Sequence, residues 1–370
     1  MKVVYFGTID DQVSPRVRQL REGLRRNGVV VEECRAQGGW LSRYAQLVRQ
    51  FQQVARGASV VLVSKPGQRE VPLACALARS RDLPVVHDFF ASLYVNDVIE
   101  RRRTHERSLR AGKLHLLDAS ALRLADLTLV DTRAHGDLLA ATFGVARARL
   151  RRVFVGAEDQ FRPLPGKRCE GSLEVLYCGT FIPFHGVDVV LHAALRLARV
   201  RSLHFALLGE GQELARMKAL AAELRLENVR FEVPVPYEEL PERLAQADLC
   251  LGIFAQSPTA RVVIPKKVFA ALACARPVVT ADTLGIREAV DEESAYLCEA
   301  GNPESLAATI LKAADEPVRR REVAARGRAL HERIFTTQAV GAALRSLLEE
   351  LVAGEDGRFT GSRAAAGGES

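Results

Sequence analysis

Four loops in the sequence have the residue types and spacing of loops that hold a phosphate. Three of them place glycine directly after a short apolar run, at residues 6–10, 177–188 and 208–211. The fourth, at residues 260–267, leads through two lysines into an apolar stretch. Glycine lets the backbone approach a phosphate, and the free N–H groups of a following helix attract the anion. One such loop alone is more often an ordinary turn, but four in equivalent positions favour a bound diphosphate.

Two adjacent lysines, Lys266 and Lys267, follow Pro265 at the predicted start of a helix. A cation in the first turn opposes the helix macrodipole by about 0.3–1 kcal/mol, whereas a bound anion reverses that penalty. The simple alternative is a pair of solvated lysines. We favour Lys267 as a phosphate ligand.

Short apolar runs alternate with amphipathic stretches along the chain, and these elements must position the loops. Many runs are rich in Val and Leu without polar alternation, which is typical of strands covered on both faces. The predicted strands are residues 3–7, 29–34, 59–63, 84–88, 127–130, 152–155, 173–179, 203–208, 228–233, 249–254, 277–281 and 295–298. Strand–helix units of about 30 residues predict an α/β fold with parallel, doubly wound sheets in two Rossmann-like domains.

The helix and domain boundaries have their own signals. Apolar residues recur at three- and four-residue spacing over 41–54, and Asn302 followed by Pro303 is typical of a helix start. We expect a first domain over residues 1–160, a linker over 161–171 and a second domain over 172–353, with the last helix able to pack back on the first domain. Residues 354–370 are rich in Gly, Ala and Ser and are expected to be disordered.

The composition excludes several classes of protein. Hydrophobic residues make up 48% and charged residues 26% of the chain, which excludes a largely disordered, collagen-like or disulfide-scaffold protein. The net charge of +7 permits an anionic partner. Signal-peptide and membrane-spanning runs are absent from the sequence pattern, and the seven cysteines lack metal spacing. We therefore expect a cytoplasmic protein with reduced thiols and no metal site.

Several stretches resemble family 4 glycosyltransferases of the GT-B fold. In the second half they read LYCGTFIPFHGVDVVLHAA, LLGEGQELARMKALAAELRLENVRFE, VPYEELPERLAQADLCLGIF and IPKKVFAALACARPVVTAD. Looser matches in the first half read YFGTIDDQVSPRVRQLREGL, VVHDFFASLY and ADLTLVDTRAHGDLL. The resemblance covers roughly residues 1–350. It implies two domains facing a cleft, a nucleotide-diphosphate sugar such as a UDP- or GDP-sugar as donor, retention at the anomeric carbon, and neither a metal nor another cofactor.

The resemblance also implies a set of donor-binding residues, which are Gly179, Thr180, His185, Gly186, Gly209, Glu210, Gly211 and Lys267. The first four would border the diphosphate, the next three the base or ribose, and Lys267 the β-phosphate. Relatives often have lysine in place of His185. A histidine neutralises the leaving group only when it is protonated, and a loop histidine bound to backbone is the alternative.

The acceptor needs an orienting group, and we expect Asp88, at the end of a predicted strand, to supply it. His87 is the alternative to Asp88, and Asp10 is a weaker choice. In the purely structural alternative, the Asp88 carboxylate only caps the following turn. The loop after the first strand would border either the diphosphate or the acceptor through Gly7, Thr8 and Arg16.

The chain departs from the family pattern at two places. Relatives commonly carry a ribose-binding glutamate where this chain has Ala270, and an earlier acidic residue where it has Val262. Loss of a hydrogen bond to a charged group costs about 1.5–3 kcal/mol. This chain would therefore bind its donor weakly, bind it through another carboxylate such as Glu288, or not bind it at all. Ala275 also replaces a common glycine.

Part of the basic excess is concentrated after the Asp88 loop, at Arg101, Arg102, Arg103, His105, Arg107, Arg110 and Lys113. Together with the amphipathic stretch that starts at Trp40, this segment would meet an anionic membrane surface, at its inner face, that carries a lipid-linked acceptor. A solvated helix face is the alternative. Nucleic acid is not expected, because no aromatic–basic interleaving appears.

The leading hypothesis is a glycosyltransferase that acts on a glycan or lipid-linked acceptor. A catalytically degenerate GT-B protein that binds a partner is the second, and Ala270 is its main support. A sugar-nucleotide epimerase of the same architecture is the third, although the family 4 motifs argue against it.

Overall fold

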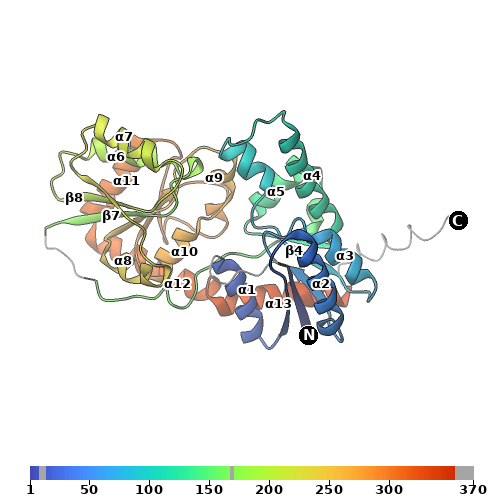
Figure 1. Cartoon of the computed structure of the whole chain (residues 1–370). Helices are drawn as coiled ribbons and strands as arrows, with labels where there is room; N and C mark the ends of the chain where they lie inside the picture. The colour runs from blue at the N-terminus through green and yellow to red at the C-terminus, as the bar shows by residue number, and fades with distance from the viewer. Residues whose placement is uncertain (8–13, 167–170, 355–370) are drawn as a thin grey trace. The chain divides into compact units, whose positions relative to one another are not determined.

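The computed structural model describes residues 1–7, 14–166 and 171–354 (Figure 1). The chain divides into two compact units. Unit 1 contains Met1–Ile99, Arg103–Phe154 and the chain from Thr337 onward, and unit 2 contains Glu100–Arg102 and Val155–Thr336. Part of the expected linker (167–170) and nearly all of the expected tail (355–370) lie outside the described residues.

Unit 1 contains a six-stranded parallel sheet in the order β2-β1-β3-β4-β5-β6. Its strands are β1 (Lys2–Gly7), β2 (Val30–Arg35), β3 (Val60–Val63), β4 (Val85–Asp88), β5 (Leu127–Val130) and β6 (Leu150–Arg152). Its helices are α1 (Pro15–Arg26), α2 (Trp40–Val54), α3 (Val71–Arg79), α4 (Leu109–Leu124), α5 (Arg133–Phe143) and α13 (Thr337–Ala353).

The central strand β1 shows why this sheet is parallel and covered on both faces. Successive side chains of a strand point to opposite faces. Val3 and Tyr5 pack with α1 and α13, whereas Val4 and Phe6 pack with α2 and α3. All four side chains are fully buried. A continuous apolar run is therefore required in the central strands, and many of the predicted strands have it.

Helix α13 packs against α1 at a close backbone contact. A Cβ atom added at Gly341 would lie 2.2 Å from the carbonyl oxygen of Gly23. Val340, Leu344 and Leu348 of α13 join the same apolar cluster as α1. The last helix of the chain thus completes the core of unit 1.

Unit 2 contains a second six-stranded parallel sheet, in the order β12-β11-β10-β7-β8-β9. Its strands are β7 (Leu173–Cys178), β8 (Leu203–Leu208), β9 (Val229–Glu232), β10 (Leu249–Leu251), β11 (Val278–Ala281) and β12 (Tyr296–Cys298). Its helices are α6 (Val187–Arg196), α7 (Leu214–Glu223), α8 (Leu240–Gln246), α9 (Pro258–Val262), α10 (Lys266–Ala273), α11 (Pro303–Asp315) and α12 (Pro317–Ile334).

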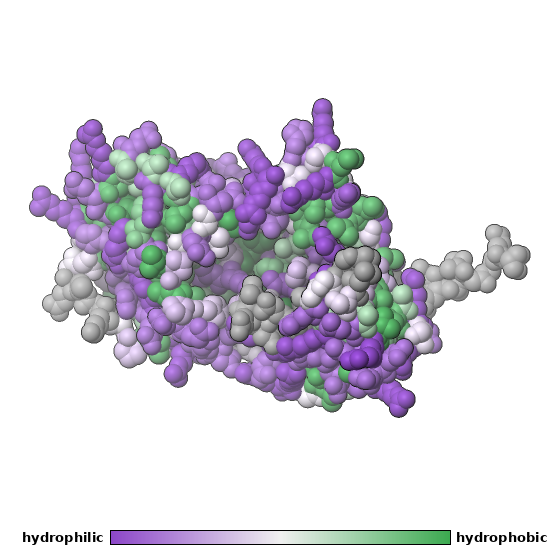
Figure 2. Space-filling view, in the orientation of Figure 1, coloured by the Kyte–Doolittle hydropathy of each residue, from purple (hydrophilic) through white to green (hydrophobic). Residues whose placement is uncertain are grey.

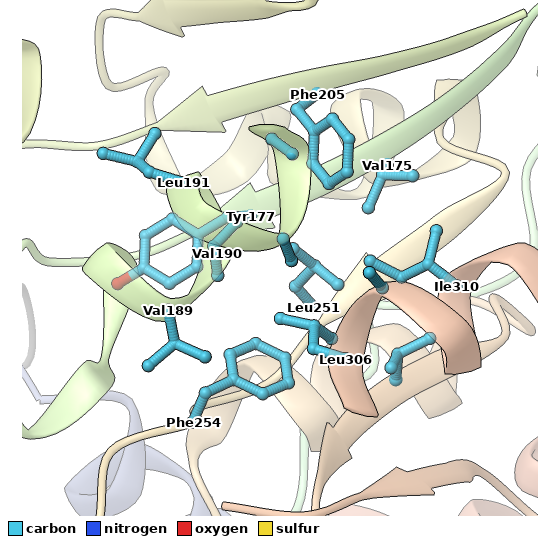
Figure 3. Close-up of a cluster of buried hydrophobic side chains, with 14 of the residues drawn as sticks. Val175, Tyr177, Val189, Val190, Leu191, Phe205, Leu251, Phe254, Leu306 and Ile310 are labelled. Carbon is cyan, nitrogen blue, oxygen red and sulfur yellow. The ribbon is translucent and has the colours of Figure 1, made fainter. Parts of the chain in front are cut away.

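Helices cover both faces of the second sheet (Figure 1). One layer consists of α6, α7 and α11, whose apolar side chains fill the core with those of the sheet. Figure 3 shows this core, with the Tyr177 ring packed near Val189 and Val190 and its hydroxyl oxygen directed away from the labelled side chains. The apolar body of Tyr177 therefore belongs to the core while its polar end faces the edge of the sheet.

Each sheet has one point where the strand order reverses. In unit 1 it lies between β1 and β3, and in unit 2 between β7 and β10. Ligands of open α/β sheets bind outside the carboxyl ends of the strands at such points. The topology therefore directs the search for a site to the residues that follow these four strands.

The predicted fold class and all twelve predicted strands are confirmed, and the ends of all twelve agree within three residues. The strand predicted over 152–155 is shifted the most, because β6 is Leu150–Arg152. The turn Arg147–Arg149 leads directly into Leu150, and the chain leaves the sheet after Arg152. At the predicted start of α11, the Asn302 side chain accepts a hydrogen bond from the Ser305 N–H at 3.0 Å.

None of the described helices combines the length and the apolar character that a membrane span needs. Within the described residues, no three His, Cys, Asp or Glu side chains gather into a group that could hold a metal ion.

Candidate functional site

The centre of the candidate site is Lys267, in the first turn of α10, beside the strand-order reversal of unit 2. Its Nζ lies 3.6 Å from the centre of the Tyr177 ring. The ammonium group is buried and has no hydrogen-bond partner among the residues that the structure describes. Burial lowers the pKa of Lys267 to about 7. A bound anion would stabilise the charged form of this lysine.

Gly179 follows β7 directly and leaves room for this lysine. A Cβ atom at Gly179 would lie 2.8 Å from the Lys267 Nζ and 2.9 Å from its Cε. Any side chain at this position would force the ammonium group to move. The Gly179 N–H donates to the Leu208 carbonyl oxygen at 2.9 Å, which ties the end of β7 to the end of β8.

The loops after β7 and β8 are joined by backbone contacts. The Phe181 N–H donates to the Glu210 carbonyl oxygen at 2.7 Å, and the Glu213 N–H donates to that of Phe181 at 3.0 Å. A Cβ atom at Gly209 would lie 1.9 Å from the Gly179 carbonyl oxygen. The structure thus brings together the predicted residues of both loops, which are Gly179, Thr180, Gly209, Glu210 and Gly211.

His185 is held by the loop backbone. Its Nδ1 lies 2.6 Å from the Thr180 carbonyl oxygen and 2.8 Å from the Tyr177 hydroxyl, which itself donates to Thr180 at 2.9 Å. A carbonyl oxygen only accepts hydrogen bonds, so Nδ1 carries the proton. Burial and the Lys267 ammonium hold the pKa of His185 well below its usual value. The neutral ring therefore presents Nε2 as an acceptor, which gives no charge to a phosphate.

The segment after His185 connects this loop to β10. The Phe254 N–H donates to the His185 carbonyl oxygen at 3.0 Å, and Gly186 is the residue at which α6 begins. Backbone contacts thus link the loops after β7, β8 and β10. All eight predicted donor-binding residues lie in these loops and in the first turn of α10.

The positions that depart from the family pattern carry no carboxylate in the structure either. Ala270 is a half-buried residue of α10, and Val262 is the last residue of α9. Glu288, the proposed substitute, belongs to the short turn Ile286–Glu288 and has a contact of its own. Ala275 has φ = 52°, a left-handed conformation that favours glycine.

In unit 1, the predicted residues Arg16 and Asp88 bind each other. The Arg16 Nε donates to the two carboxylate oxygens of Asp88 at 2.8 and 3.1 Å, and its Nη2 lies 2.8 Å from Oδ1. Both side chains are fully buried. The guanidinium group also donates to the Val153 carbonyl oxygen at 3.3 Å. The carboxylate of Asp88 is thus a structural partner of Arg16 with no exposed surface for an acceptor.

The other residues predicted to border the acceptor are His87, Gly7, Thr8 and Asp10. His87 is fully buried, and burial lowers its pKa to about 3, so its ring is neutral. Gly7 ends β1, and a Cβ atom there would lie 3.4 Å from the Ser64 Oγ. Thr8 and Asp10 lie outside the described residues.

Sequence reasoning did not single out two further features. One is Lys65, which follows β3 and whose Nζ lies 4.1 Å from the centre of the Phe90 ring. The other is a pocket of about 860 Å³ in unit 2, lined by Arg261, Asp282, Arg287, Glu292 and Glu299 among others. None of the predicted site residues lines it. The one sequence signal that could have pointed to Lys65 is its position shortly after a predicted strand.

Comparisons with known proteins define the class. Residues 172–316 match the family model described as Glycosyl transferases group 1. The structure is similar to Anabaena HepE in complex with UDP, with a TM-score of 0.70 and 16% identity over 95% of this chain and 100% of that chain. It is similar to sucrose-phosphate synthase from Thermosynechococcus elongatus, with a TM-score of 0.71 and 18% identity over 95% and 99%. The chain has the GT-B fold, with two Rossmann-like domains, and the resemblance to family 4 glycosyltransferases is confirmed.

Two curated relatives are more similar in sequence. D-inositol 3-phosphate glycosyltransferase of Thermomonospora curvata is 30% identical over 275 residues, which are 68% of this chain and 62% of that protein. The GDP-mannose-dependent monoacylated alpha-(1-6)-phosphatidylinositol monomannoside mannosyltransferase of Corynebacterium glutamicum is 25% identical over 183 residues, 47% of each chain. The matched segments span less than two thirds of either relative.

Proposed function

We propose that the protein is a glycosyltransferase that takes its sugar from a nucleotide-diphosphate sugar. One observation carries the proposal: a buried lysine without a hydrogen-bond partner among the described residues lies at the strand-order reversal of unit 2. The glycine loops after β7 and β8 flank it. The family match over residues 172–316 covers these elements and gives the site its reaction class.

The reaction breaks the bond between the anomeric carbon and the diphosphate oxygen, and the electron pair stays on the diphosphate. Lys267 and the N–H groups at the start of α10 would stabilise this developing charge. In other transferases a metal ion neutralises the charge of the leaving diphosphate. Here the cationic site would do so, which supports our proposal of a metal-independent enzyme. With retention, the acceptor oxygen attacks from the leaving-group side, and its proton passes to the released phosphate oxygen.

His185 would play a positioning role in the unliganded site. Its Nδ1–H holds the Thr180 carbonyl oxygen and so fixes the loop beside Gly179. The neutral ring adds no charge to the site, so the charge of the diphosphate would be met by Lys267 and by the N–H groups at the start of α10.

We propose that unit 1 binds the acceptor, with Asp88 as a positioning residue. The buried Arg16–Asp88 pair joins the first turn of α1 to the end of β4. It also reaches the backbone after β6 through Val153. Asp88 would thereby hold the carboxyl edge of the sheet in shape without touching the acceptor itself.

We propose that the acceptor is a glycan or a lipid-linked sugar at the inner, cytoplasmic face of a membrane. On α4, Leu109 is 88% exposed and Leu116 is 64% exposed. They lie seven residues apart on one helix face, with exposed Lys113 between them. Figure 2 shows hydrophobic and hydrophilic side chains next to one another over α4. Exposed leucine beside a basic cluster fits an anionic lipid surface.

Sedimentation with phosphatidylglycerol vesicles tests the membrane proposal. The double variant Leu109→Ser/Leu116→Ser should lose most vesicle binding, whereas Val318→Ser, an exposed apolar residue of α12, should bind as the wild type does. Equal binding by all three proteins would reject α4 as the contact.

A degenerate binding protein is the second candidate, and Ala270 favours it. A panel of UDP-, GDP- and other nucleotide sugars separates the candidates by calorimetry and product analysis. Binding with transfer or slow hydrolysis supports the transferase. Absence of binding to every donor supports the degenerate protein, and interconversion of the donors without transfer supports an epimerase. Lys267→Met is the matched variant, and it should weaken donor binding strongly.

A further inference from the structure

The strand-order reversal of unit 1 carries a second lysine that the proposed donor chemistry does not use. Lys65 comes two residues after β3, which lies beside β1 at that reversal. Its Nζ lies 4.1 Å from the centre of the Phe90 ring, which follows β4. Lys267 has the same arrangement in unit 2, over the ring of Tyr177. Each sheet therefore has a lysine over an aromatic ring at the position where open α/β sheets bind ligands.

The charges around Lys65 leave it uncompensated. Arg16 pairs with Asp88, and Arg43 lies 3.4 Å from Glu70, so each of these buried carboxylates already has its own cation. No carboxylate of the described residues forms an ion pair with Lys65. Burial lowers the pKa of Lys65, the Asp88 charge opposes this effect, and the nearby Arg16 guanidinium offsets part of that opposition. An added anion would remove this imbalance.

The loop that carries Lys65 is also held in place. The Gln68 amide donates to the Ala91 carbonyl oxygen at 2.9 Å, which ties the loop after β3 to the segment after β4. A Cβ atom at Gly67 would lie 2.4 Å from the Ser64 carbonyl oxygen, so this loop packs closely on itself. The Arg16 guanidinium lies 5.4 Å from the same Phe90 ring. Lys65 thus extends from a well-anchored loop over the Phe90 ring.

We propose that Lys65 binds a phosphate group carried by the acceptor, so that the acceptor is a phosphorylated sugar or polyol. The inference rests on the proposed transferase function and names its acceptor class. A lysine ammonium binds phosphate as a compact point charge with three donors. The phosphate would then anchor the acceptor at the carboxyl edge of β1 and β3 and leave its hydroxyl groups free to react.

Lysine acetylation tests the proposal on the full-length protein, with each site followed by mass spectrometry. Glucose 6-phosphate and inorganic phosphate should each slow acetylation of Lys65 at least threefold, whereas glucose and sodium chloride of equal ionic strength should not. The exposed Lys312 of α11 serves as the internal control. UDP should protect Lys267 independently, so failure of the donor site and failure of this inference give different results.

A second measurement uses variants. Broadening of the ³¹P resonance of glucose 6-phosphate should fall at least fivefold in Lys65→Met, persist in Lys65→Arg and persist in Lys312→Met. Unchanged UDP binding by Lys65→Met would show an intact fold. The proposal is overturned if neither phosphate compound protects Lys65, if glucuronate protects it and they do not, or if Lys65→Met binds phosphate as the wild type does.

Discussion

The ammonium group of Lys267 lies 3.6 Å from the centre of the Tyr177 ring, although the two residues belong to different layers of unit 2. The ring offers only its π face to this charge, and no carboxylate of the described residues pairs with the lysine. Such a site is electrostatically incomplete until an anion arrives. If the donor binds here as we propose, its binding and the charge of Lys267 should be coupled.

The first prediction concerns removal of that charge. Lys267→Met should weaken UDP binding by about 1.5–3 kcal/mol, the usual contribution of a hydrogen bond to a charged group. The free energy of unfolding without ligand should not fall, because the variant removes an unpaired buried charge. Calorimetry with UDP and urea unfolding measure the two quantities. A variant that unfolds more easily and binds UDP normally would show that Lys267 is structural.

The second prediction concerns pH. The pKa of Lys267 is about 7 in the empty site, and a bound diphosphate raises it. Binding therefore takes up a proton above pH 7, and UDP affinity should fall as pH rises from 7 to 9, by up to about tenfold per unit. Tyr177, Cys178 and His185 face the lysine, and none of them should interfere. The pKa values of the first two are raised and that of His185 is lowered, so all three stay neutral in this range.

Lys267→Arg is the matched control for the pH dependence. Arginine keeps its charge throughout this range, so the affinity of the variant for UDP should change little between pH 7 and 9. Calorimetry in buffers of different ionisation enthalpy would count the protons taken up. A wild-type affinity that stays constant over this range would exclude proton uptake by Lys267.

The third prediction concerns the buried pair in unit 1. Asp88→Asn leaves the fully buried Arg16 without its counter-ion and should cost about 3–5 kcal/mol of unfolding free energy. The double variant Arg16→Met/Asp88→Leu should be clearly more stable than Asp88→Asn, because it removes both charges. Urea unfolding monitored by circular dichroism measures both. If Asp88→Asn lost transfer activity at full stability, the carboxylate would act directly on the acceptor.

The outcome at Asp88 shows what the sequence could and could not predict. The central strands were accessible because a strand covered on both faces must be apolar throughout, as Val3 to Phe6 are. The partner of Asp88 was not, because Arg16 is 72 residues away and meets it only through the order of the strands. The Tyr177–Lys267 contact likewise depends on the way α10 packs beside β7. Local pattern thus located the loops, and topology decided which side chains meet.

The last prediction concerns Ala275, the residue after the C-cap of α10. The Ala275 N–H donates to the Leu272 carbonyl oxygen at 3.1 Å, and the Arg276 N–H to that of Ala271 at 2.9 Å. This pair of bonds is a Schellman motif, in which the residue with positive φ is normally glycine. At φ = 52°, Ala275→Gly should raise the unfolding free energy by roughly 1 kcal/mol.

The matched control for that change is Ala273→Gly, in the last turn of the same helix. Here φ is helical, so glycine should lower the unfolding free energy by roughly 0.5–1 kcal/mol. Opposite signs for the two substitutions, two residues apart, would assign the effect to the left-handed backbone at Ala275. Effects of the same sign would show that α10 responds only to the loss of a methyl group. Because α10 carries Lys267 in its first turn, a stabilising Ala275→Gly should leave UDP affinity intact, which calorimetry on the same variants checks.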